Sequence, residues 1–274
     1  MKAGIIGGTG KMGRLFGLVF ERAGYDVLVS GRSTPLSNTR LAEQCDLVVV
    51  SVPIRDTVRV IEEITPVLRR DQLLCDLTSL KTAPVAAMMK SEAQVIGLHP
   101  LFGPTVPSLF HQTIIVCPAR ATEEAVSSLL AIFGREGAEC TIATPDQHDR
   151  MMAVVQGLTH FVTLCMAESI RRLGIDITTT RAFTSPVYEI ELSLVGRLLS
   201  QDPSLYADIL QQNPYVAGVL SSCIDSAGDL RDIVVSKDPA RFSDFFLEDR
   251  RHLGTWCDEG MKTTDALIEC MVNR

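Results

Sequence analysis

The chain begins with a glycine-rich turn between an apolar run and a segment of helical periodicity. The segment IIGGTGKMGRLF carries Gly8, Gly10 and Gly13 in the spacing G-x-G-x-x-G, directly after the apolar residues of AGIIG. Between a strand and a helix, such glycines permit a tight turn, close approach of the backbone to a pyrophosphate, and close packing of helix on strand. The free amide groups at the start of the helix also attract phosphate. The spacing alone is weak evidence, but its position predicts a dinucleotide-binding unit rather than an ordinary glycine turn.

The end of the second expected strand bears on the choice between NAD and NADP. In YDVLVSG, Gly31 occupies the place where NAD-binding proteins usually carry an acidic residue for the ribose. Arg32, Ser33 and Thr34 follow, and an arginine beside two hydroxyls suits a 2′-phosphate. NADP is therefore favoured and NAD remains an alternative, while an incidental arginine on a solvated loop is the other interpretation. The expected cofactor-binding residues are Gly8, Thr9, Gly10, Lys11, Met12, Gly13, Arg32, Ser33 and Pro53.

The first half of the chain alternates between apolar runs and segments of helical periodicity. The expected strands are AGIIG, YDVLVSG, CDLVVVSVP, QLLCDLTS, QVIGLHP, TIIVCPA and ECTIAT. The expected helices are residues 11–23, TVRVIEEITPVL, APVAAMMK and EEAVSSLLAIFGREG. Such alternation predicts a Rossmann-type α/β domain with a doubly wound parallel sheet over residues 1–145.

The second half, residues 146–274, keeps helical periodicity and loses the strand pattern. Asp146 is the expected cap of a long helix that ends at Gly174. Further helices are expected over residues 185–200, 204–212, 215–236 and 240–271. Long helices with apolar faces often pair between subunits, so this half is interpreted as an all-helical, substrate-binding and dimerisation domain of a homodimer.

The overall charge and composition exclude several classes of protein. The chain has 274 residues, 46% of them hydrophobic, and a formal net charge of −7. Such a chain can bury a core and is not disordered. Its negative surface does not attract nucleic acid or an anionic membrane. No apolar run approaches the roughly 20 residues of a membrane span, and the immediate first strand leaves no room for a signal peptide.

The cysteines indicate a reducing compartment. The eight cysteines are scattered, without a CxxC pair or zinc-ligand spacing, and several lie in apolar runs. They are interpreted as reduced thiols of a cytoplasmic protein, with neither a disulfide framework nor a metal site.

Polar residues follow three of the expected parallel strands, in SVP (51–53), DLTSLK (76–81) and GLHPLFGP (97–104). Ligands bind at the carboxyl ends of strands in open α/β sheets, so Ser79, Lys81 and His99 are expected to converge there. His99 could act as a base oriented by Ser79. The alternatives are a serine that caps the next helix, a solvated lysine in its first turn, and a histidine that only ends a strand.

Six motifs occur in an order that resembles the prephenate dehydrogenase family. They are GGTGKMGRLF, SVPI, DLTSLK, GLHPLFGP, QHDRMMAVVQGLTHF and SPVYEIELSLVGRLLSQDPSLYADI, and they span both halves. The similarity is closest to the dehydrogenase portion of bifunctional chorismate mutase–prephenate dehydrogenases, and arogenate dehydrogenases are close relatives. Neither the mutase region of those proteins nor a C-terminal regulatory domain is expected in this chain.

This resemblance implies the NAD(P)-dependent oxidative decarboxylation of prephenate to 4-hydroxyphenylpyruvate in tyrosine biosynthesis. By the same analogy, His99 takes the proton of the ring hydroxyl and Ser79 orients His99 or shares the hydroxyl. Arg197 matches the arginine that binds a substrate carboxylate, with a surface helix charge as its alternative. His160 matches a histidine near the substrate side chain, with a core histidine as its alternative, and Lys81 completes the expected substrate-binding set.

Two further positions of the resemblance carry no assigned role. His148 also matches the family, but its interpretation as part of a helix start is stronger. Glu189 stands where the bifunctional relatives carry a basic residue, which weakens inference about the charge of the pocket.

Three rival functions remain open. One is the same chemistry on arogenate or another amino-substituted prephenate. The second is a reductase that passes hydride between NADP and a deazaflavin, but that leaves GLHPLFGP and Arg197 unexplained. The third is a catalytically silent dinucleotide-binding sensor, which has no need for Ser79, His99 and Arg197 together.

Overall fold

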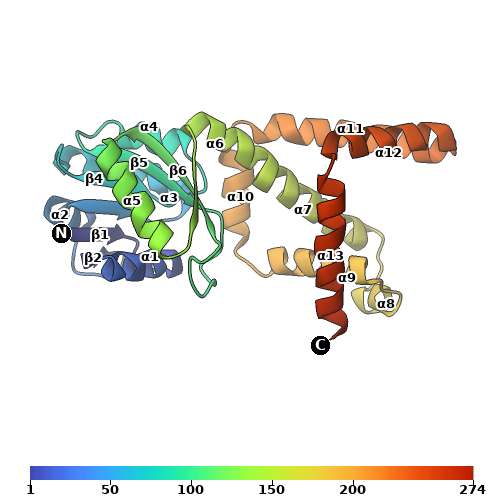
Figure 1. The fold of residues 1–274 in the computed structure, drawn as a ribbon, viewed down its shortest axis with the longest axis horizontal. Helices are drawn as coiled ribbons and strands as arrows, with labels where there is room; N and C mark the ends of the chain where they lie inside the picture. The colour runs from blue at the N-terminus through green and yellow to red at the C-terminus, as the bar shows by residue number, and fades with distance from the viewer. Residues whose placement is uncertain (274) are drawn as a thin grey trace. The chain divides into compact units, whose positions relative to one another are not determined.

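The computed structural model describes residues 1–273, and the first part of the chain forms a seven-stranded sheet between two layers of helices (Figure 1). The strand order is β2-β1-β3-β4-β5-β6-β7. The strands are β1 (Lys2–Ile6), β2 (Asp26–Ser30), β3 (Leu47–Val50), β4 (Leu73–Asp76), β5 (Gln94–Pro100), β6 (Thr113–Arg120) and β7 (Glu139–Ile142). The helices between them are α1 (Lys11–Arg22), α2 (Asn38–Gln44), α3 (Ile54–Ile64), a short 3-10 helix (Thr65–Val67), α4 (Thr82–Met88) and α5 (Glu123–Arg135).

Each face of the sheet has its own hydrophobic core. On one face, Phe16 and Phe20 of α1 pack against Phe133 of α5, with ring centroids 6.0–6.5 Å apart. Helices α2, α3 and α4 cover the other face. A fully buried phenylalanine contributes about 1.5–3 kcal/mol, so the three rings are a large part of the first core. This arrangement confirms the predicted doubly wound α/β fold.

One pair of strands departs from the parallel pattern. Strands β5 and β6 are antiparallel, with His99 opposite Ile115, whereas the other neighbouring strands are parallel. A parallel connection needs a crossover, usually a helix, and residues 101–112 between β5 and β6 contain no helix. The chain therefore turns back beside β5 after the GLHPLFGP segment.

Some helices differ from the sequence-based predictions. Helix α2 was not predicted because its sequence, NTRLAEQ, is short and polar; Ser37 caps it by accepting a hydrogen bond from the Arg40 amide. The single helix expected over residues 240–271 is two helices, α12 (Pro239–Leu253) and α13 (Trp256–Val272). They separate at Gly254, whose φ of 57° lies in the region that glycine tolerates best.

The long helix that Asp146 was expected to cap begins two residues earlier than predicted and changes geometry in the middle. Helix α6 (Pro145–Met152) is capped by Thr144 in a capping box with Gln147, rather than by Asp146. A π-helical segment (Ala153–Leu158) follows, and α7 (Thr159–Arg172) completes the run. Single π-turns inside helices are frequent at functional sites.

By length and composition, the helical run Pro145–Arg172 could cross a membrane, contrary to the expectation that no segment approaches such a span. Core and interface helices of other proteins meet the same two criteria. This run carries buried polar residues, His148 and Asp149, on α6. One such helix is weak evidence for a membrane protein, and we assign it no membrane role.

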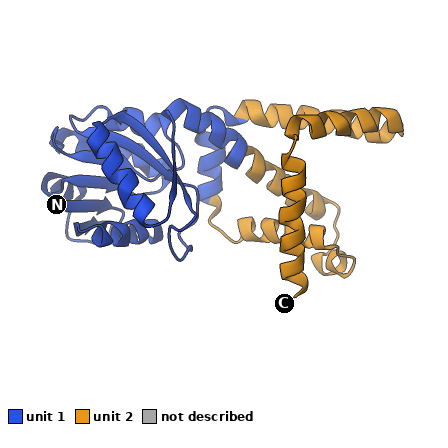
Figure 2. Ribbon diagram, viewed as in Figure 1, with its two compact units in different colours: residues 1–156, 204–216 blue, residues 157–203, 217–274 orange. Residues whose placement is uncertain are grey.

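The chain divides into two compact units (Figure 2). The first contains residues 1–156 and 204–216, and the second contains residues 157–203 and 217–274. By its contacts, α6 therefore belongs with the sheet, as does α10 (Pro203–Gln212), where Asp208 pairs with Arg55 of α3 at 3.0 Å. The sequence predicted two domains that meet at residue 145, whereas the contacts place residues 146–156 and 204–216 with the sheet.

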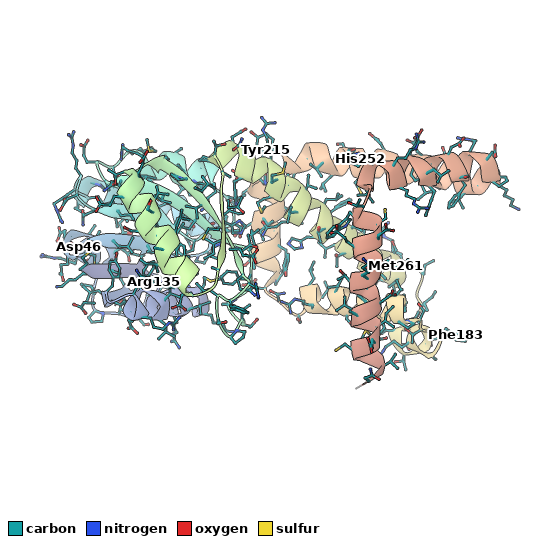
Figure 3. All side chains as sticks on the ribbon, viewed as in Figure 1. Asp46, Arg135, Phe183, Tyr215, His252 and Met261 are labelled. Atoms are coloured by element: carbon teal, nitrogen blue, oxygen red, sulfur yellow. The ribbon has the colours of Figure 1, made fainter. Side chains whose placement is uncertain are left out.

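The second unit is helical and contains little core of its own. Its further helices are α8 (Ile177–Ala182), α9 (Pro186–Leu199) and α11 (Val216–Ser236), of which α8 was not predicted. Helices α7, α12 and α13 contain no buried residue within the described chain. Large apolar side chains are exposed instead, including Phe183 (87%) and Met261 (64%) (Figure 3).

Candidate functional site

The turn after β1 is shaped by contacts that leave no room for side chains. Gly7 has a φ of 80°, and a Cβ there would lie 2.1 Å from the Ser51 carbonyl oxygen. A Cβ on Gly13 would lie 2.6 Å from the Gly7 carbonyl oxygen, so α1 packs directly on the turn. Helix α1 starts at Lys11 with its N-terminus at this turn. The geometry fits the close approach of a pyrophosphate to backbone amides, as the sequence predicts.

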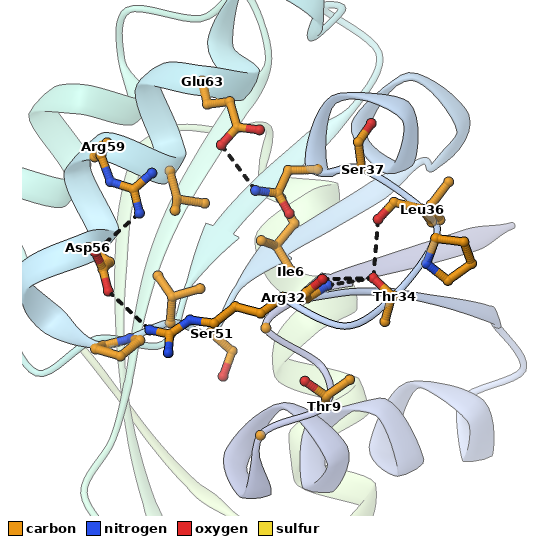
Figure 4. A pocket seen from close by; sticks show the side chains of 18 residues that line it. Ile6, Thr9, Arg32, Thr34, Leu36, Ser37, Ser51, Asp56, Arg59 and Glu63 are labelled. Carbon is orange, nitrogen blue, oxygen red and sulfur yellow. Dashed lines mark hydrogen bonds and ion pairs between the residues drawn. The ribbon is translucent and has the colours of Figure 1, made fainter.

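A cavity of about 660 Å³ lies beside this turn, at the carboxyl ends of β1, β2 and β3 (Figure 4). Its walls include Thr9 and Gly10 of the turn, Arg32 after β2, and Pro53 before α3. This is the edge of an α/β sheet at which dinucleotides bind. The residues present therefore fit an NAD(P) cofactor.

Not every predicted cofactor residue lines this cavity. Thr9, Gly10, Arg32 and Pro53 do, whereas Gly8, Lys11, Met12, Gly13 and Ser33 are not among its lining residues. Gly13 acts through helix packing, as described above. Gly8 is similarly confined, since a Cβ there would lie 2.7 Å from the Val29 side chain.

A cluster of charges surrounds the end of β2 (Figure 4). Asp56 of α3 lies 3.1 Å from the Arg59 guanidinium and 3.9 Å from that of Arg32. The Arg32 side chain is 92% exposed, so its guanidinium is free to turn toward another anion. Thr34 does not face outward: its hydroxyl accepts a hydrogen bond from the Gly31 amide at 2.8 Å.

His99 is the second-to-last residue of β5 in the same unit, and its imidazole is enclosed by hydrogen-bonding groups. The residue is only 2% exposed. Its Nδ1 lies 2.8 Å from Nε2 of His148, and its Nε2 lies 3.5 Å from the side-chain nitrogen of Gln156 in the π-helical segment. His148 and Gln156, rather than Ser79, are therefore the hydrogen-bonding neighbours of this ring.

Asp149 anchors the far end of this hydrogen-bonded chain. Its Oδ1 lies 2.7 Å from Nδ1 of His148 and accepts the Lys81 amide at 2.8 Å, while Oδ2 accepts the Thr82 amide at 2.8 Å. Asn213, directly after α10, donates to the Asp149 carbonyl at 2.8 Å. The carboxylate thus fixes the start of α4 and one imidazole at once.

The prediction that Lys81 binds substrate is not supported by its position, and neither is its interpretation as a solvated charge. Its side chain is completely buried. The ammonium forms an ion pair with Asp76 at the end of β4 and donates to the Leu98 carbonyl at 2.8 Å. The buried ammonium therefore links Asp76 of β4 to Leu98 of β5, the residue before His99. Its role in the site is structural.

Ser79 lies half-buried in the segment between β4 and α4. Its interpretation as the helix cap is wrong, because α4 begins at Thr82 with Lys81 in the cap position. Asp149, from another helix, accepts hydrogen bonds from the first amides of α4.

Burial sets the protonation of this cluster. It lowers the pKa of His99 well below its ordinary value of 6.5, and electrostatic effects of the neighbouring His148 and Lys81 side chains act in the same direction. Burial also lowers the pKa of His148, against the opposing effect of Asp149. Burial alone would raise the pKa of Asp149, but hydrogen bonds from His148, Thr82 and Lys81 outweigh it and hold that pKa low. Both imidazoles are therefore neutral near neutral pH, and the carboxylate is charged.

Three buried polar atoms of the described chain lack a hydrogen-bond partner, and all three belong to this region. They are Oδ1 of Asp76, Oγ1 of Thr78 and Oε1 of Gln156. Unsatisfied buried polar groups are rare and call for an explanation such as a functional role. No group of three or more metal-ligating side chains occurs within residues 1–273.

Arg197 and His160, the other two predicted substrate-binding residues, belong to the second unit. Arg197 lies exposed near the end of α9, and its guanidinium has no ion-pair partner within the described chain. His160 is half-buried on α7, where burial lowers its pKa. Glu189 pairs with Arg181 at 3.1 Å, so the acidic residue found in place of a basic one is neutralised locally.

The sequence did not predict the roles of Asp76, Asp149 and Gln156, and it gave His148 a helix-start role. The adjacent His and Asp in QHDRMM were a usable signal, because a carboxylate beside an imidazole commonly orients it. The partner of Lys81 could not be read from spacing, since the ion pair depends on the course of the chain after β4.

Two family models match the chain and together cover most of it. The nucleotide-binding domain of prephenate dehydrogenase matches residues 30–142, and the dimerization domain of prephenate dehydrogenase matches residues 144–273.

Among curated proteins, a probable arogenate/prephenate dehydrogenase of Methanocaldococcus jannaschii is 35% identical over 96% of this chain and 64% of its own length. The T-protein of Haemophilus influenzae is 31% identical over 97% of this chain and 70% of its own length. A 4-amino-4-deoxyprephenate dehydrogenase of Streptomyces pristinaespiralis is 27% identical over 91% of this chain and 90% of its own. The chain thus spans about two thirds of the length of the first two relatives.

Solved structures share the fold. Arogenate dehydrogenase from Synechocystis superposes with a TM-score of 0.73 at 17% identity, covering 96% of this chain and 100% of that one. Prephenate dehydrogenase from Aquifex aeolicus, in complex with hydroxyphenyl propionate and NAD+, also gives 0.73 at 18% identity, covering 93% and 99%.

Proposed function

Because the chain belongs to the prephenate dehydrogenase family, we propose that it catalyses the NAD(P)-dependent oxidative decarboxylation of prephenate to 4-hydroxyphenylpyruvate. The observation that carries this proposal is a buried, neutral imidazole, that of His99, at the carboxyl end of a strand in the same sheet as the dinucleotide cavity. A dinucleotide site alone would fit many reactions. A base enclosed at the same edge of the sheet narrows the chemistry to loss of a proton together with a hydride.

The reaction balances as follows. The ring carbon that bears the hydroxyl loses a hydride, and the hydroxyl loses its proton to a base. The ring carboxylate leaves as CO2, and its bonding electrons complete the aromatic ring. The phenolate oxygen so formed takes a proton back from the protonated base or from water, which gives 4-hydroxyphenylpyruvate. Aromatisation makes the reaction effectively irreversible. The nicotinamide supplies the hydride acceptor when the cofactor is bound.

His99 has the properties required of the base. A general base must be unprotonated and must be held within hydrogen-bond reach of the proton it takes. Burial keeps the His99 imidazole neutral, and hydrogen bonds to its Nδ1 side fix the ring. Ser79, on the segment after β4, is proposed to share the substrate hydroxyl, as the family resemblance implies.

Arg197 is proposed to bind a substrate carboxylate. Its guanidinium is exposed and is not engaged in an ion pair within residues 1–273, so it can form a bidentate pair with a carboxylate. His160 is proposed to lie near the substrate side chain, as in the family resemblance.

NADP is the proposed cofactor, with NAD as the alternative. Arg32 and Arg59 both reach Asp56 beside the cavity, and a 2′-phosphate could replace that carboxylate as their partner. The absence of an acidic side chain at Gly31, at the end of β2, supports the same choice.

The substrate proposal keeps one alternative class. The names of the relatives include arogenate/prephenate and 4-amino-4-deoxyprephenate dehydrogenases. An amine in the side chain would leave the proposed roles of His99 and Arg197 unchanged. An amine in place of the ring hydroxyl would give His99 an N–H proton to take instead of an O–H proton. A silent dinucleotide-binding sensor is less well supported, because it has no use for an enclosed, hydrogen-bonded base.

A homodimer in the cytoplasm is the proposed state. The match to a dimerization domain and the exposed apolar helices of the second unit support the dimer. Within the described residues the cysteines are free, as expected in a reducing compartment.

The test is to follow reduced-nicotinamide absorbance with prephenate and with arogenate, each with NAD and with NADP. We expect turnover with prephenate and NADP. Comparison of the kcat/KM values in the four mixtures shows which substrate and which cofactor the protein prefers. A flat trace in all four mixtures, from protein that binds NADP, would reject the proposed reaction and favour the sensor.

A further inference from the structure

The hydrogen-bonded chain that runs from Asp149 through His148 to His99 has a direction. Asp149 is a carboxylate with a low pKa, so it can only accept hydrogen bonds. Nδ1 of His148, 2.7 Å away, must therefore carry a proton. His148 is neutral, so its other nitrogen, Nε2, carries a lone pair.

The proton positions on His148 determine those on His99. Nδ1 of His99 lies 2.8 Å from Nε2 of His148, which carries a lone pair, so Nδ1 must donate its proton to Nε2. A neutral imidazole has one N–H, so Nε2 of His99 is left with a lone pair. The Gln156 side-chain nitrogen, at 3.5 Å, is a donor and agrees with a lone pair at that position.

We propose that Asp149 and His148 are positioning residues that fix the tautomer of His99, so that its Nε2 is the atom that takes the substrate's proton. This inference rests on the proposed function for the identity of the proton, but the tautomer itself does not depend on any substrate. The arrangement resembles the carboxylate–histidine logic of hydrolase triads with a second imidazole inserted.

The charged groups around this chain do not compete with Asp149 for its role. Asp76 at the end of β4 pairs with Lys81 of the segment that follows. The Lys81 ammonium also donates to the Leu98 carbonyl, and not to either imidazole. Cys117 of β6 lies opposite Gly97 and keeps its proton, because burial raises the pKa of its thiol to about 12. Asp149 is thus the charged group that is hydrogen-bonded to His148 and, through it, linked to His99.

Removing the charge of Asp149 should reverse the chain. In Asp149→Asn, the amide oxygen can keep the Oδ1 position, where it accepts from His148 and the Lys81 amide, or the amide nitrogen can take that position. In the second rotamer the nitrogen would donate to His148, so His148 would donate from Nε2. His99 would then carry its proton on Nε2 and could not act as the base.

The direct experiment is long-range ¹⁵N–¹H NMR on protein labelled with [¹⁵N]histidine, in which protonated and lone-pair nitrogens have distinct shifts. The chain has only five histidines, and His99→Asn identifies the His99 signals by their loss. We expect wild-type His99 to be protonated at Nδ1 and unprotonated at Nε2, and Asp149→Asn to transfer the proton to Nε2 in a substantial fraction. A wild-type His99 protonated at Nε2 would overturn the proposal, and this outcome needs no variant to fold.

Kinetics with prephenate provide the second readout. We expect Asp149→Asn to lower kcat about 100-fold or more while KM changes by less than about 3-fold, since general bases and their orienting groups are worth factors of that order. The acid limb of the kcat/KM profile should move to lower pH, because losing the carboxylate further disfavours protonated His99. Asp146→Asn is the matched control on the same helix: its exposed carboxylate pairs with Arg150 at 2.7 Å, and we expect kcat within about 2-fold of wild type.

Different results would reject the proposed reaction and the positioning role of Asp149. If wild type turned over neither prephenate nor arogenate, the proposed function would fail, while the nitrogen shifts would still decide the tautomer. If Asp149→Asn folded and lowered kcat without changing the tautomer or moving the acid limb, Asp149 would be a structural anchor for α4, and the positioning role would be rejected.

Discussion

At the scale of single residues, the candidate site depends on burying groups that titrate. The His99 ring is nearly inaccessible to water and is surrounded by His148 and by the Lys81–Asp76 ion pair. Burial disfavours the charged form of an imidazole, so the enclosure that keeps His99 neutral also makes its protonation costly to the fold.

The first prediction concerns stability as a function of pH. The pKa values of His99 and His148 are lowered in the folded chain, so below about pH 6.5 the unfolded chain binds more protons than the folded one. Stability should therefore fall as pH drops below about 6.5, and His99→Asn should weaken this dependence. Urea unfolding of both proteins between about pH 5 and 8 measures it. Parallel curves for the two proteins would show that His99 does not contribute.

Arg32 carries the second prediction. If its guanidinium binds a 2′-phosphate, Arg32→Ala should raise the KM for NADP about 10-fold and leave the KM for NAD nearly unchanged, as expected for one hydrogen bond to a charged group. Arg40→Ala, which removes another exposed arginine paired only with Glu43 of its own helix, is the control. Equal effects on the KM values of both cofactors would mean that Arg32 does not bind the 2′-phosphate of NADP.

At the scale of secondary-structure elements, the turn after β1 and helix α1 act together. The turn is narrow because the backbone of Gly7, Gly8 and Gly13 is in close contact. The helix N-terminus can present its amides to a phosphate only while this contact is kept.

The third prediction tests that contact. Gly13→Ala places a methyl group 2.6 Å from the Gly7 carbonyl oxygen and should force α1 away from the turn. We expect a loss of about 1–3 kcal/mol in the free energy of unfolding, and weaker NADP binding. Gly17→Ala, four residues later on the same helix, meets nothing nearer than 3.8 Å and should be neutral or stabilising. Differential scanning calorimetry and NADP titration of both variants measure the contrast. Equal changes in the two variants would show that the contact between Gly13 and the Gly7 carbonyl is not what matters.

The sequence predicted the elements better than it predicted their contacts. Runs such as LVVV of β3 and the glycine turn are local signals, so the sheet and the cofactor edge followed from them. The antiparallel β6, the π-helical segment and the burial of Lys81 depend on contacts between distant parts of the chain. Asp149 accepts the amide of Lys81 across 68 residues of sequence, and no spacing rule could have found that bond.

At the scale of the whole molecule, the two units differ in how they are stabilised. The first has two hydrophobic cores, one on each face of its sheet. The second exposes large apolar side chains, among them Phe183 directly after α8, Val235 on α11 and Met261 on α13. Large exposed apolar surface of this kind marks a protein interface.

The fourth prediction follows from that difference. If a second copy of the chain covers the apolar helices, the second unit is stable only in the dimer, and Tm should rise with protein concentration. Analytical ultracentrifugation and thermal unfolding over a 100-fold concentration range measure both quantities. A monomer with a concentration-independent Tm would contradict the dimer.

The proposed reaction requires His99 to remove a proton as hydride leaves and CO2 is released. The most direct measurement is the yield of CO2 and of reduced nicotinamide from prephenate, in wild type and in His99→Asn. We expect one CO2 for each reduced nicotinamide in wild type, and a rate lower by a factor of about 100 to 10,000 in the variant with NADP binding retained. Reduction of the cofactor without CO2, or a variant as fast as wild type, would contradict the account.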